Sequence, residues 1–283
     1  MKHPMVMGFV AVSCALLCVS TEASVGRTAY AFRSTDGRFL EIDLPAEAPD
    51  VPVWADPASR DLTWSGAGST RDADAQILSL DFTSAEIVAF DPSSPNHEIV
   101  ASLGLPIDWT SDLSFGPGGT LILLRDDELY DVELTTGSAT LRAQLNQEYH
   151  SIEYHQGSFF ASGRFQLFLR IDPITHIETP IGPNIYGCGL QGLSSDGSQL
   201  WYLMTCSTSG SAPTSTDLGT IDPATGQMTP YIHVVNNLYL ETYFGLEVVE
   251  QTPSPIPALH PLGLALLTAL IGGAGVLVAR HSS

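Results

Sequence analysis

The sequence predicts an all-β fold, most simply a propeller of five four-stranded blades, on the basis of three observations. An apolar residue followed by an acid, a short turn and a second β-prone run recurs five times. The segments that lead into these turns alternate apolar and polar residues, as half-buried strands do. The first and last repeats are incomplete in complementary ways. Together these features indicate radial repeats that close into a ring.

The spacing of the repeat matches the length of a blade. Successive instances start 48, 42, 39 and 50 residues apart, and one four-stranded blade needs about 40–50 residues. Turn spacing alone does not separate this fold from six blades or from a β-sandwich, so both stay open as alternatives. The instances start at Ile42, Phe90, Val132, Ile171 and Ile221.

Paired strands precede three of the repeats. Each pair is a strand, a glycine-containing turn and a more apolar strand, which is the pattern of the innermost hairpin of a blade. No amphipathic helix longer than two turns is evident between Arg27 and Glu250. The three hairpins span residues 112–124, 151–162 and 189–204.

The two ends of the body complete each other. Only the strand-like segment 28–32 stands before the first repeat, whereas a surplus strand, 243–250, follows the last. A propeller closes its ring by building one blade from both termini, which removes the exposed sheet edges. The turns of the repeat also resemble those of extracellular β-propeller repeat proteins. That resemblance implies architecture and no particular activity.

The N-terminal segment 1–23 reads as a secretory signal peptide. Lys2 is followed by an apolar run from Met5 to Val19, and small residues precede a cleavage site between Ala23 and Ser24. The sequence therefore predicts export by the secretion machinery. The exported body is expected to be residues 24–250, one globular domain.

The C-terminal segment 251–283 reads as a membrane-targeting tail. Residues 251–261 form a proline-rich spacer, and the apolar segment 262–279 carries no charge. A helix of that length spans about 27 Å, close to the hydrocarbon core of a bilayer. Residues 280–283 add a basic end, which is expected to stay in the cytoplasm while the body lies outside. The sequence thus predicts one transmembrane helix in the inner membrane.

The junction of spacer and helix resembles the IPTL-CTERM sorting signal of Gram-negative surface proteins. Alanine stands where that signal usually has threonine, and a single arginine replaces its basic cluster. The resemblance covers only the segment 256–283 and implies cleavage by an exosortase-like membrane enzyme, followed by delivery to the cell surface or extracellular matrix. A plain membrane anchor is the alternative. The residues that carry the motif are Ile256, Pro257, Ala258, Leu259, Gly263 and Arg280.

The charge of the chain excludes some partners. The formal net charge is −20, and removing the signal peptide leaves no lysine. Nucleic acids and anionic membrane surfaces are bound through basic patches, so neither is an expected partner. An extracellular polysaccharide or a protein remains as the expected ligand of the body.

Two cysteines, Cys188 and Cys206, remain after the signal peptide is removed, in a compartment that permits disulfides. A hairpin centred near Gly197 would place them directly opposite each other, with Cα atoms about 4.5–5.5 Å apart. A disulfide can bridge that separation. The sequence therefore predicts a disulfide between these two residues.

No catalytic or cofactor-binding motif is recognisable. His150, Glu153 and His155 lie close in sequence, but in a strand His150 would point away from the other two, so no metal site is expected. Acids are too numerous for any pair to be distinguished as a glycosidase dyad. Tryptophans could stack on sugars, although packing between blades is their commoner use.

These observations favour an exported, non-catalytic propeller that binds a glycan or a protein and needs no cofactor. The alternative is an exported carbohydrate-active enzyme of the glycosidase type.

Overall fold

The computed structural model describes residues 26 to 250 apart from short gaps, and the predicted signal peptide and the predicted membrane-targeting tail lie outside the described residues. The residues left out include Ala23, Ser24 and all residues of the sorting motif. The gaps are at 34–37, 46, 51, 56–57, 62–65, 73–75, 93, 95, 164–167, 183–187, 207–214 and 235–242. Within the described part of the chain, no helix is long and apolar enough to cross a membrane.

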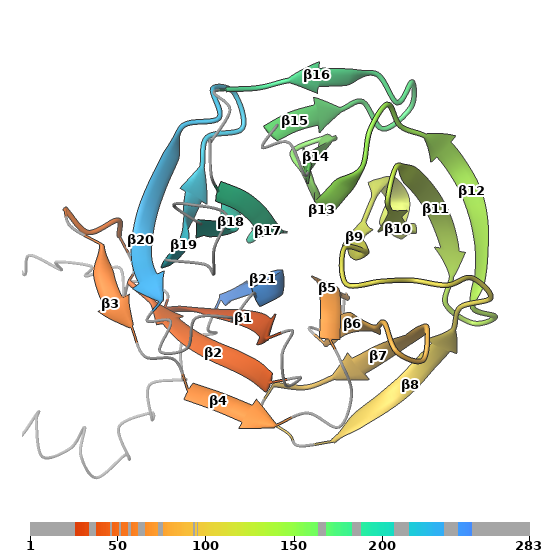
Figure 1. The fold of residues 1–283 in the computed structure, drawn as a ribbon, viewed down its shortest axis with the longest axis horizontal. Helices are drawn as coiled ribbons and strands as arrows, with labels where there is room; N and C mark the ends of the chain where they lie inside the picture. The colour runs from red at the N-terminus through yellow and green to blue at the C-terminus, as the bar shows by residue number, and fades with distance from the viewer. Residues whose placement is uncertain are drawn as a thin grey trace, which may run out of the picture.

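Five sheets surround a central axis, so the protein is a five-bladed β-propeller (Figure 1). The prediction of an all-β propeller is confirmed, and the sandwich and six-blade alternatives are wrong. The described residues contain no α-helix, only one short 3-10 turn, η1 (Pro117–Gly119).

Blades 2, 3 and 4 are antiparallel sheets of four consecutive strands each, and the other two blades differ from this plan. Blade 2 contains β5 (Gly66–Arg71), β6 (Ile77–Asp81), β7 (Glu86–Phe90) and β8 (His97–Ser102). Blade 3 contains β9 (Asp112–Phe115), β10 (Leu121–Arg125), β11 (Glu128–Glu133) and β12 (Ser138–Gln144). Blade 4 contains β13 (Tyr149–His155), β14 (Ser158–Gly163), β15 (Phe168–Ile171) and β16 (Glu178–Pro180).

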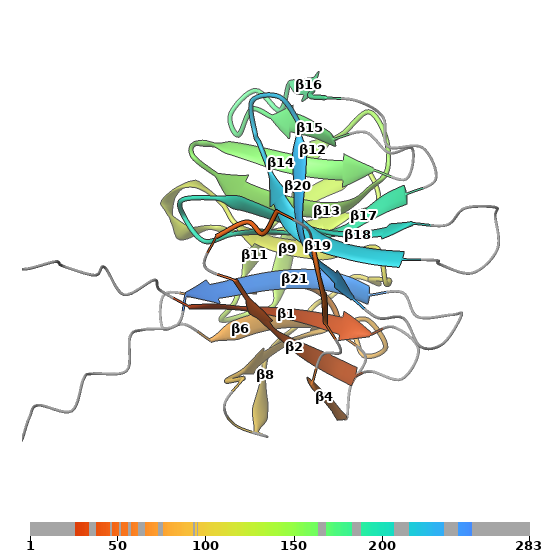
Figure 2. The same ribbon diagram turned by 90° about the vertical axis from the view of Figure 1, so that its left-hand side faces the viewer.

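Blade 1 is built from both ends of the domain, as the sequence predicts. The C-terminal strand is its innermost strand and pairs antiparallel with the N-terminal strand, and Figure 2 shows the two side by side. All strands that close the ring therefore lie between Arg27 and Glu250, so this segment holds the whole fold. The blade contains β21 (Tyr243–Glu250), β1 (Arg27–Arg33), β2 (Arg38–Leu44) and β4 (Ala58–Asp61), in that order.

Blade 5 carries a fifth strand that the sequence pattern does not reveal. This strand, β3 (Val53–Ala55), lies in the run after the first repeat and pairs parallel with β20 (Met228–Val234) of the neighbouring blade. The added strand covers part of an outer edge that would otherwise present unpaired backbone groups. The blade contains β17 (Cys188–Ser195), β18 (Leu200–Cys206), β19 (Ser215–Ile221), β20 (Met228–Val234) and β3.

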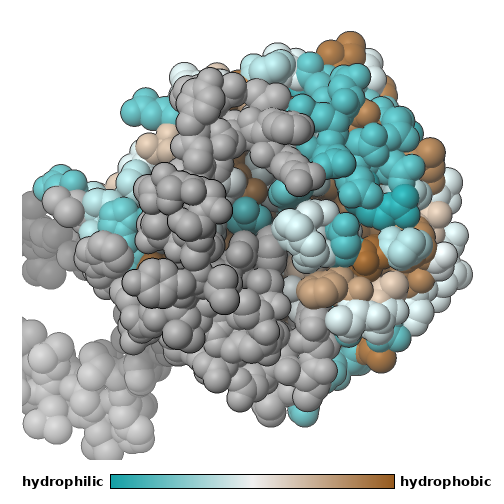
Figure 3. All heavy atoms as spheres, viewed as in Figure 1, coloured by the Kyte–Doolittle hydropathy of each residue, from teal (hydrophilic) through white to brown (hydrophobic). Residues whose placement is uncertain are grey.

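Hydrophobic clusters fill the spaces between neighbouring blades. Trp201 is fully buried between blades 5 and 1, and its ring lies 5.0 Å from that of Tyr231. On the surface, hydrophilic residues cover much of the upper right of the face in Figure 3, with hydrophobic residues scattered among them. Burial of apolar side chains between the blades thus accounts for the packing, since each sheet has two faces to cover.

The register of blade 5 places Cys188 directly opposite Cys206, as the sequence predicts. The side chain of Cys188 lies outside the described residues, so the disulfide itself stays a prediction. Closing a loop of this length is expected to contribute about 3 kcal/mol to the free energy of unfolding. Thiol labelling of the unfolded, unreduced protein should find no reactive cysteine. Labelling of both cysteines would contradict the pairing.

Candidate functional site

The innermost strand of each blade presents unpaired backbone groups toward the centre, and side chains of neighbouring blades bind several of them. The five innermost strands β21, β5, β9, β13 and β17 surround the axis (Figure 1). An unpaired buried N–H costs free energy comparable to a lost hydrogen bond. Carboxylate and serine oxygens at the axis accept hydrogen bonds from some of these N–H groups, and these bonds link neighbouring blades.

Asp112 links three blades. One carboxylate oxygen accepts the N–H of Leu113 at 2.9 Å, and the other accepts the N–H of Ile152 in blade 4 at 2.9 Å. The N–H of Ser69 in blade 2 also donates to this carboxylate. Gly68 permits the close approach, because a Cβ there would lie 2.1 Å from Asp112 Oδ1. Asp112 therefore joins blades 2, 3 and 4 at the axis.

Serine hydroxyls also accept hydrogen bonds from backbone N–H groups of the neighbouring blade. Ser114 Oγ accepts the N–H of Tyr154 at 2.9 Å and donates to Glu153 Oε2 at 3.2 Å. Ser194 Oγ accepts the N–H of Val248 at 3.0 Å and also bonds to Glu247. Each serine thus joins a backbone group of the next blade to a buried acid.

Three buried carboxyl groups meet near the axis. Asp112, Glu153 and Glu247 are at most 9% exposed, and electrostatic repulsion among them adds to the effect of burial. Burial raises the pKa of all three, and that of Glu247 reaches about 8 although Arg71 Nε lies 3.6 Å from its carboxylate. At neutral pH part of this cluster is protonated. Proximity of acids with raised pKa values is a feature of glycosidase sites, but here all three groups are buried and hydrogen-bonded to backbone or serine groups of the protein.

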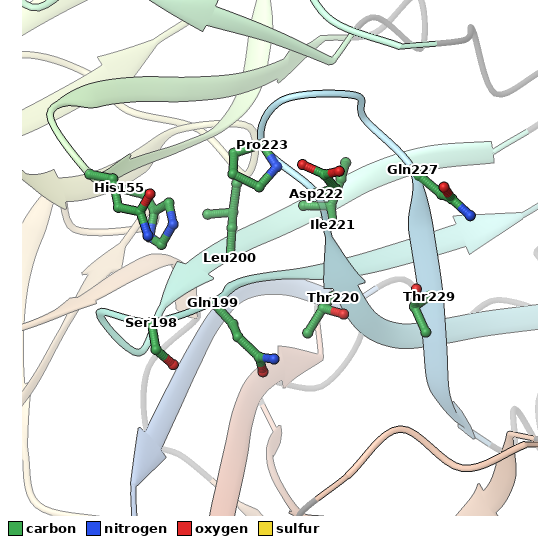
Figure 4. A pocket seen from close by; sticks show the side chains of 11 residues that line it. His155, Ser198, Gln199, Leu200, Thr220, Ile221, Asp222, Pro223, Gln227 and Thr229 are labelled. Atoms are coloured by element: carbon green, nitrogen blue, oxygen red, sulfur yellow. The ribbon is translucent and has the colours of Figure 1, made fainter.

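A large cavity lies at one end of blade 5, beside the β13–β14 turn of blade 4 (Figure 4). Its volume is about 430 Å³. Three turns form its walls: β13–β14, β17–β18 and β19–β20. Its lining is polar but mostly uncharged, with glutamine amides and hydroxyl groups around a few aliphatic side chains. The lining residues are His155, Gln156, Ser198, Gln199, Leu200, Thr220, Ile221, Asp222, Pro223, Gln227 and Thr229.

Register explains how the threonines of this cavity come together. Thr220 on β19 pairs with Thr229 on β20 and with Trp201 on β18. Directly opposite residues place their side chains on one face of a sheet, so the two hydroxyl groups are neighbours, and Figure 4 shows them close together. Trp201 forms the buried end of this row.

The two titratable residues of the cavity leave it with one negative charge. Burial lowers the pKa of His155. The negative charge of Asp196 opposes this shift only in part, so the ring is neutral at pH 7. Its Nδ1 shares a hydrogen bond of 2.8 Å with Ser195 Oγ. The N–H of Ala224 and the hydroxyl of Thr225 bind Asp222 and lower its pKa, so that carboxylate is ionised.

A second, smaller cavity contains an exposed tryptophan. Trp109, which is 46% exposed, meets the ring of His150 edge-on at 5.8 Å. The cavity of about 240 Å³ is formed mainly by the segment before β9, the β10–β11 turn and the start of β13. Burial and the nearby acids Asp108 and Glu148 raise the pKa of Asp126 in its wall. Its lining residues are Asp108, Trp109, Thr110, Asp126, Glu148 and His150.

The structure separates the histidine-rich motif of β13. His150 lies in the tryptophan cavity, Glu153 at the axis and His155 in the cavity of blade 5. Glu153 and His155 are 9% and 2% exposed, because neighbouring blades cover this innermost edge strand. Of the tryptophans whose side chains are described, Trp201 packs between blades and Trp109 is exposed.

Sequence reasoning missed Asp112, Glu247 and the glutamines of the large cavity. Asp112 begins the strand "DLSF", and Glu247 lies within "GLEVVE", which also ends in an acid. An acid next to a leucine in an innermost strand is the signal that could have identified them. Glutamines on turns carry no comparable signal.

No protein-family model and no curated protein matches the chain. Among solved structures, it is similar to a chain of "Crystal structure of Nidogen/Laminin Complex", at 10% sequence identity with a TM-score of 0.51. The match covers 80% of this chain and 100% of that one. At this identity the similarity supports the propeller fold alone.

Proposed function

We propose that the protein is exported and acts as a non-catalytic propeller that binds an extracellular glycan or protein. The observation that carries the binding role is a difference in accessibility between the polar groups at the axis and those of the large cavity. The three axial acids are buried and already bonded within the protein, Asp112 to backbone N–H groups and Glu247 to Ser194, whereas the large cavity keeps hydrogen-bonding side chains on an accessible wall. A solved structure of similar fold comes from a protein–protein complex, which is consistent with a propeller that binds a protein.

A glycan and protein array probed with the purified 24–250 domain tests this role. We expect selective, saturable binding to a small class of extracellular polysaccharides or proteins. Absence of any saturable binding would leave a purely structural protein and contradict the proposal.

We also propose that the tail sorts the propeller to the cell surface or matrix. The proposal rests on the apolar segment 262–279 and on the motif from Ile256 to Leu259 before it. An exosortase-like enzyme would cut near that motif after the export machinery delivers the chain to the inner membrane. Intact-mass measurement should then find a mature protein that ends near this motif. A membrane-bound product that still ends at Ser283 would indicate a plain anchor.

An exported carbohydrate-active enzyme is the second candidate. The specific observation in its favour is that Glu153 and Glu247 interact electrostatically near the axis and both have raised pKa values. Against it stands their burial, because a glycoside would need direct contact with both carboxyl groups. Turnover of an oligosaccharide decides between the two candidates.

A further inference from the structure

The large cavity of blade 5 offers both hydrogen-bond donors and acceptors. Glutamine amides and hydroxyl groups each do both, and sugar hydroxyls do the same. Among the described residues, five of these side chains form no hydrogen bond through their polar ends. They are Gln156, Gln199, Thr220, Gln227 and Thr229.

Gln199 gives the most specific indication of a ligand. Its Oε1 is buried and has no hydrogen-bond partner among the described residues. A buried polar atom without a partner costs about 1–3 kcal/mol, and a rotation of the Gln199 side chain into the cavity would let a ligand hydroxyl remove that cost by pairing with it. If the amide of Gln199 is turned so that its nitrogen takes the place of its oxygen, the buried nitrogen also needs a polar partner.

The apolar part of the lining suits the C–H face of a sugar ring. Leu200 and Ile221 are at most 2% exposed, and Pro223 lies beside them at the cavity (Figure 4). The volume of about 430 Å³ lies in the lower range of small-ligand sites, which run from about 300 to 1,000 Å³. A mono- or disaccharide unit fits that size.

Charge restricts the class of sugar. Asp222 is ionised, His155 is neutral, and no arginine is among the described residues that line the cavity. Together with the net charge of −20, this environment repels uronic acids and phosphorylated sugars. A single carboxylate whose oxygens already bind Ala224 and Thr225 provides little attraction for an amino sugar.

The tryptophan cavity is the rival site for a glycan, because an exposed indole is a common platform for sugars. Its polar lining consists mainly of the carboxylates of Asp108, Asp126 and Glu148, which accept hydrogen bonds and donate none when ionised. The hydroxyl of Thr110 already donates to Asp108. This lining is poorly matched to neutral sugar hydroxyls, which both donate and accept.

We infer that the cavity formed by the β13–β14, β17–β18 and β19–β20 turns binds a neutral mono- or disaccharide unit of an extracellular glycan. This inference rests on the binding role proposed above and assigns it a site and a ligand class. Gln199 and the pair Thr220–Thr229 bind the sugar hydroxyls, and Pro223, which is partly exposed, contacts its apolar face. Because the described lining residues include no Trp, Tyr or Phe, binding by a single unit is weak, and repeated units on a polysaccharide supply avidity.

The test uses the 24–250 domain, which contains every strand of the ring. Saturation-transfer NMR and calorimetric titration are run with neutral trisaccharides of glucose, galactose and mannose. Trigalacturonate and triglucosamine are the charged probes. We expect at least one neutral trisaccharide to bind, and Gln199→Leu and Thr220→Val each to weaken it about three- to tenfold, the effect of one lost hydrogen bond. The matched controls Gln144→Leu and Thr140→Val change exposed residues of β12 and should leave affinity unchanged.

The outcomes separate this site from the broader role. Neutral binding that survives Gln199→Leu and Thr220→Val but is lost in Trp109→Ala would overturn the site and keep a glycan-binding propeller. Binding of the charged probes alone would overturn the ligand class. If none of the sugars binds while the array finds a protein ligand, this inference fails and the binding role stands. Urea unfolding of each variant confirms that it folds.

Discussion

Replacing Asp112 with alanine is expected to lower the free energy of unfolding by about 3–9 kcal/mol, because three buried N–H groups would lose their acceptor at about 1–3 kcal/mol each. Those groups belong to Ser69, Leu113 and Ile152 in three different blades. Urea unfolding followed by tryptophan fluorescence measures the change. The substitution removes the link among blades 2, 3 and 4, so it should also reduce the cooperativity of the transition.

The matched control for Asp112 is Asp131→Ala. Asp131 is an acid on β11 whose side chain is 44% exposed and pairs with Arg142 at 2.9 Å. An exposed ion pair contributes about 0–1 kcal/mol, so this variant should unfold nearly as the parent does. Equal destabilisation by the two substitutions would show that Asp112 does not join the blades.

Stability is expected to fall as the pH rises from about 5 to 9. The pKa of Glu247 is about 8 in the folded protein against an ordinary value of 4.5, so between these values the folded state holds a proton that the unfolded state has released. The contribution of this group to stability is therefore fully present below pH 4.5 and is lost as the pH rises through 8. The slope from one such group is at most about 1.4 kcal/mol per pH unit.

Glu247→Gln serves as the comparison, since glutamine keeps the shape of the side chain and does not titrate. Urea unfolding at a series of pH values should give a shallower pH dependence for this variant than for the parent. Some dependence should remain, because Asp112 and Glu153 also have raised pKa values. Identical pH dependence in both proteins would exclude Glu247 as the source.

The fold was largely predictable because its main determinants are local. Alternation in segments such as 40–44 and 130–134 identifies strands, and the lone strand 28–32 with the surplus strand 243–250 predicts ring closure. The mirrored cysteines indicate the register of one hairpin, which the structure has. The partner of β3 was not predictable in this way, because so short a strand has no periodicity and pairs with the nearest open edge.

The candidate sites were less predictable, since they depend on contacts between blades. His155 is in a polar segment, and only the packing of blade 4 against blade 5 shows that it is buried. The role of Asp112 requires Ser69 and Ile152, which are distant in sequence. The large cavity is formed by turns of two blades. The apolar–polar pattern of a single strand does not indicate which turns of another blade lie beside it.

Binding without turnover is the central claim, and one measurement tests it most directly. An NMR time course is recorded on the 24–250 domain with an oligosaccharide that the array selects. The account predicts saturation transfer from protein to sugar and no growth of reducing-end anomeric signals over time. Steady growth of those signals, abolished in Glu153→Gln or Glu247→Gln, would show a glycosidase and contradict it.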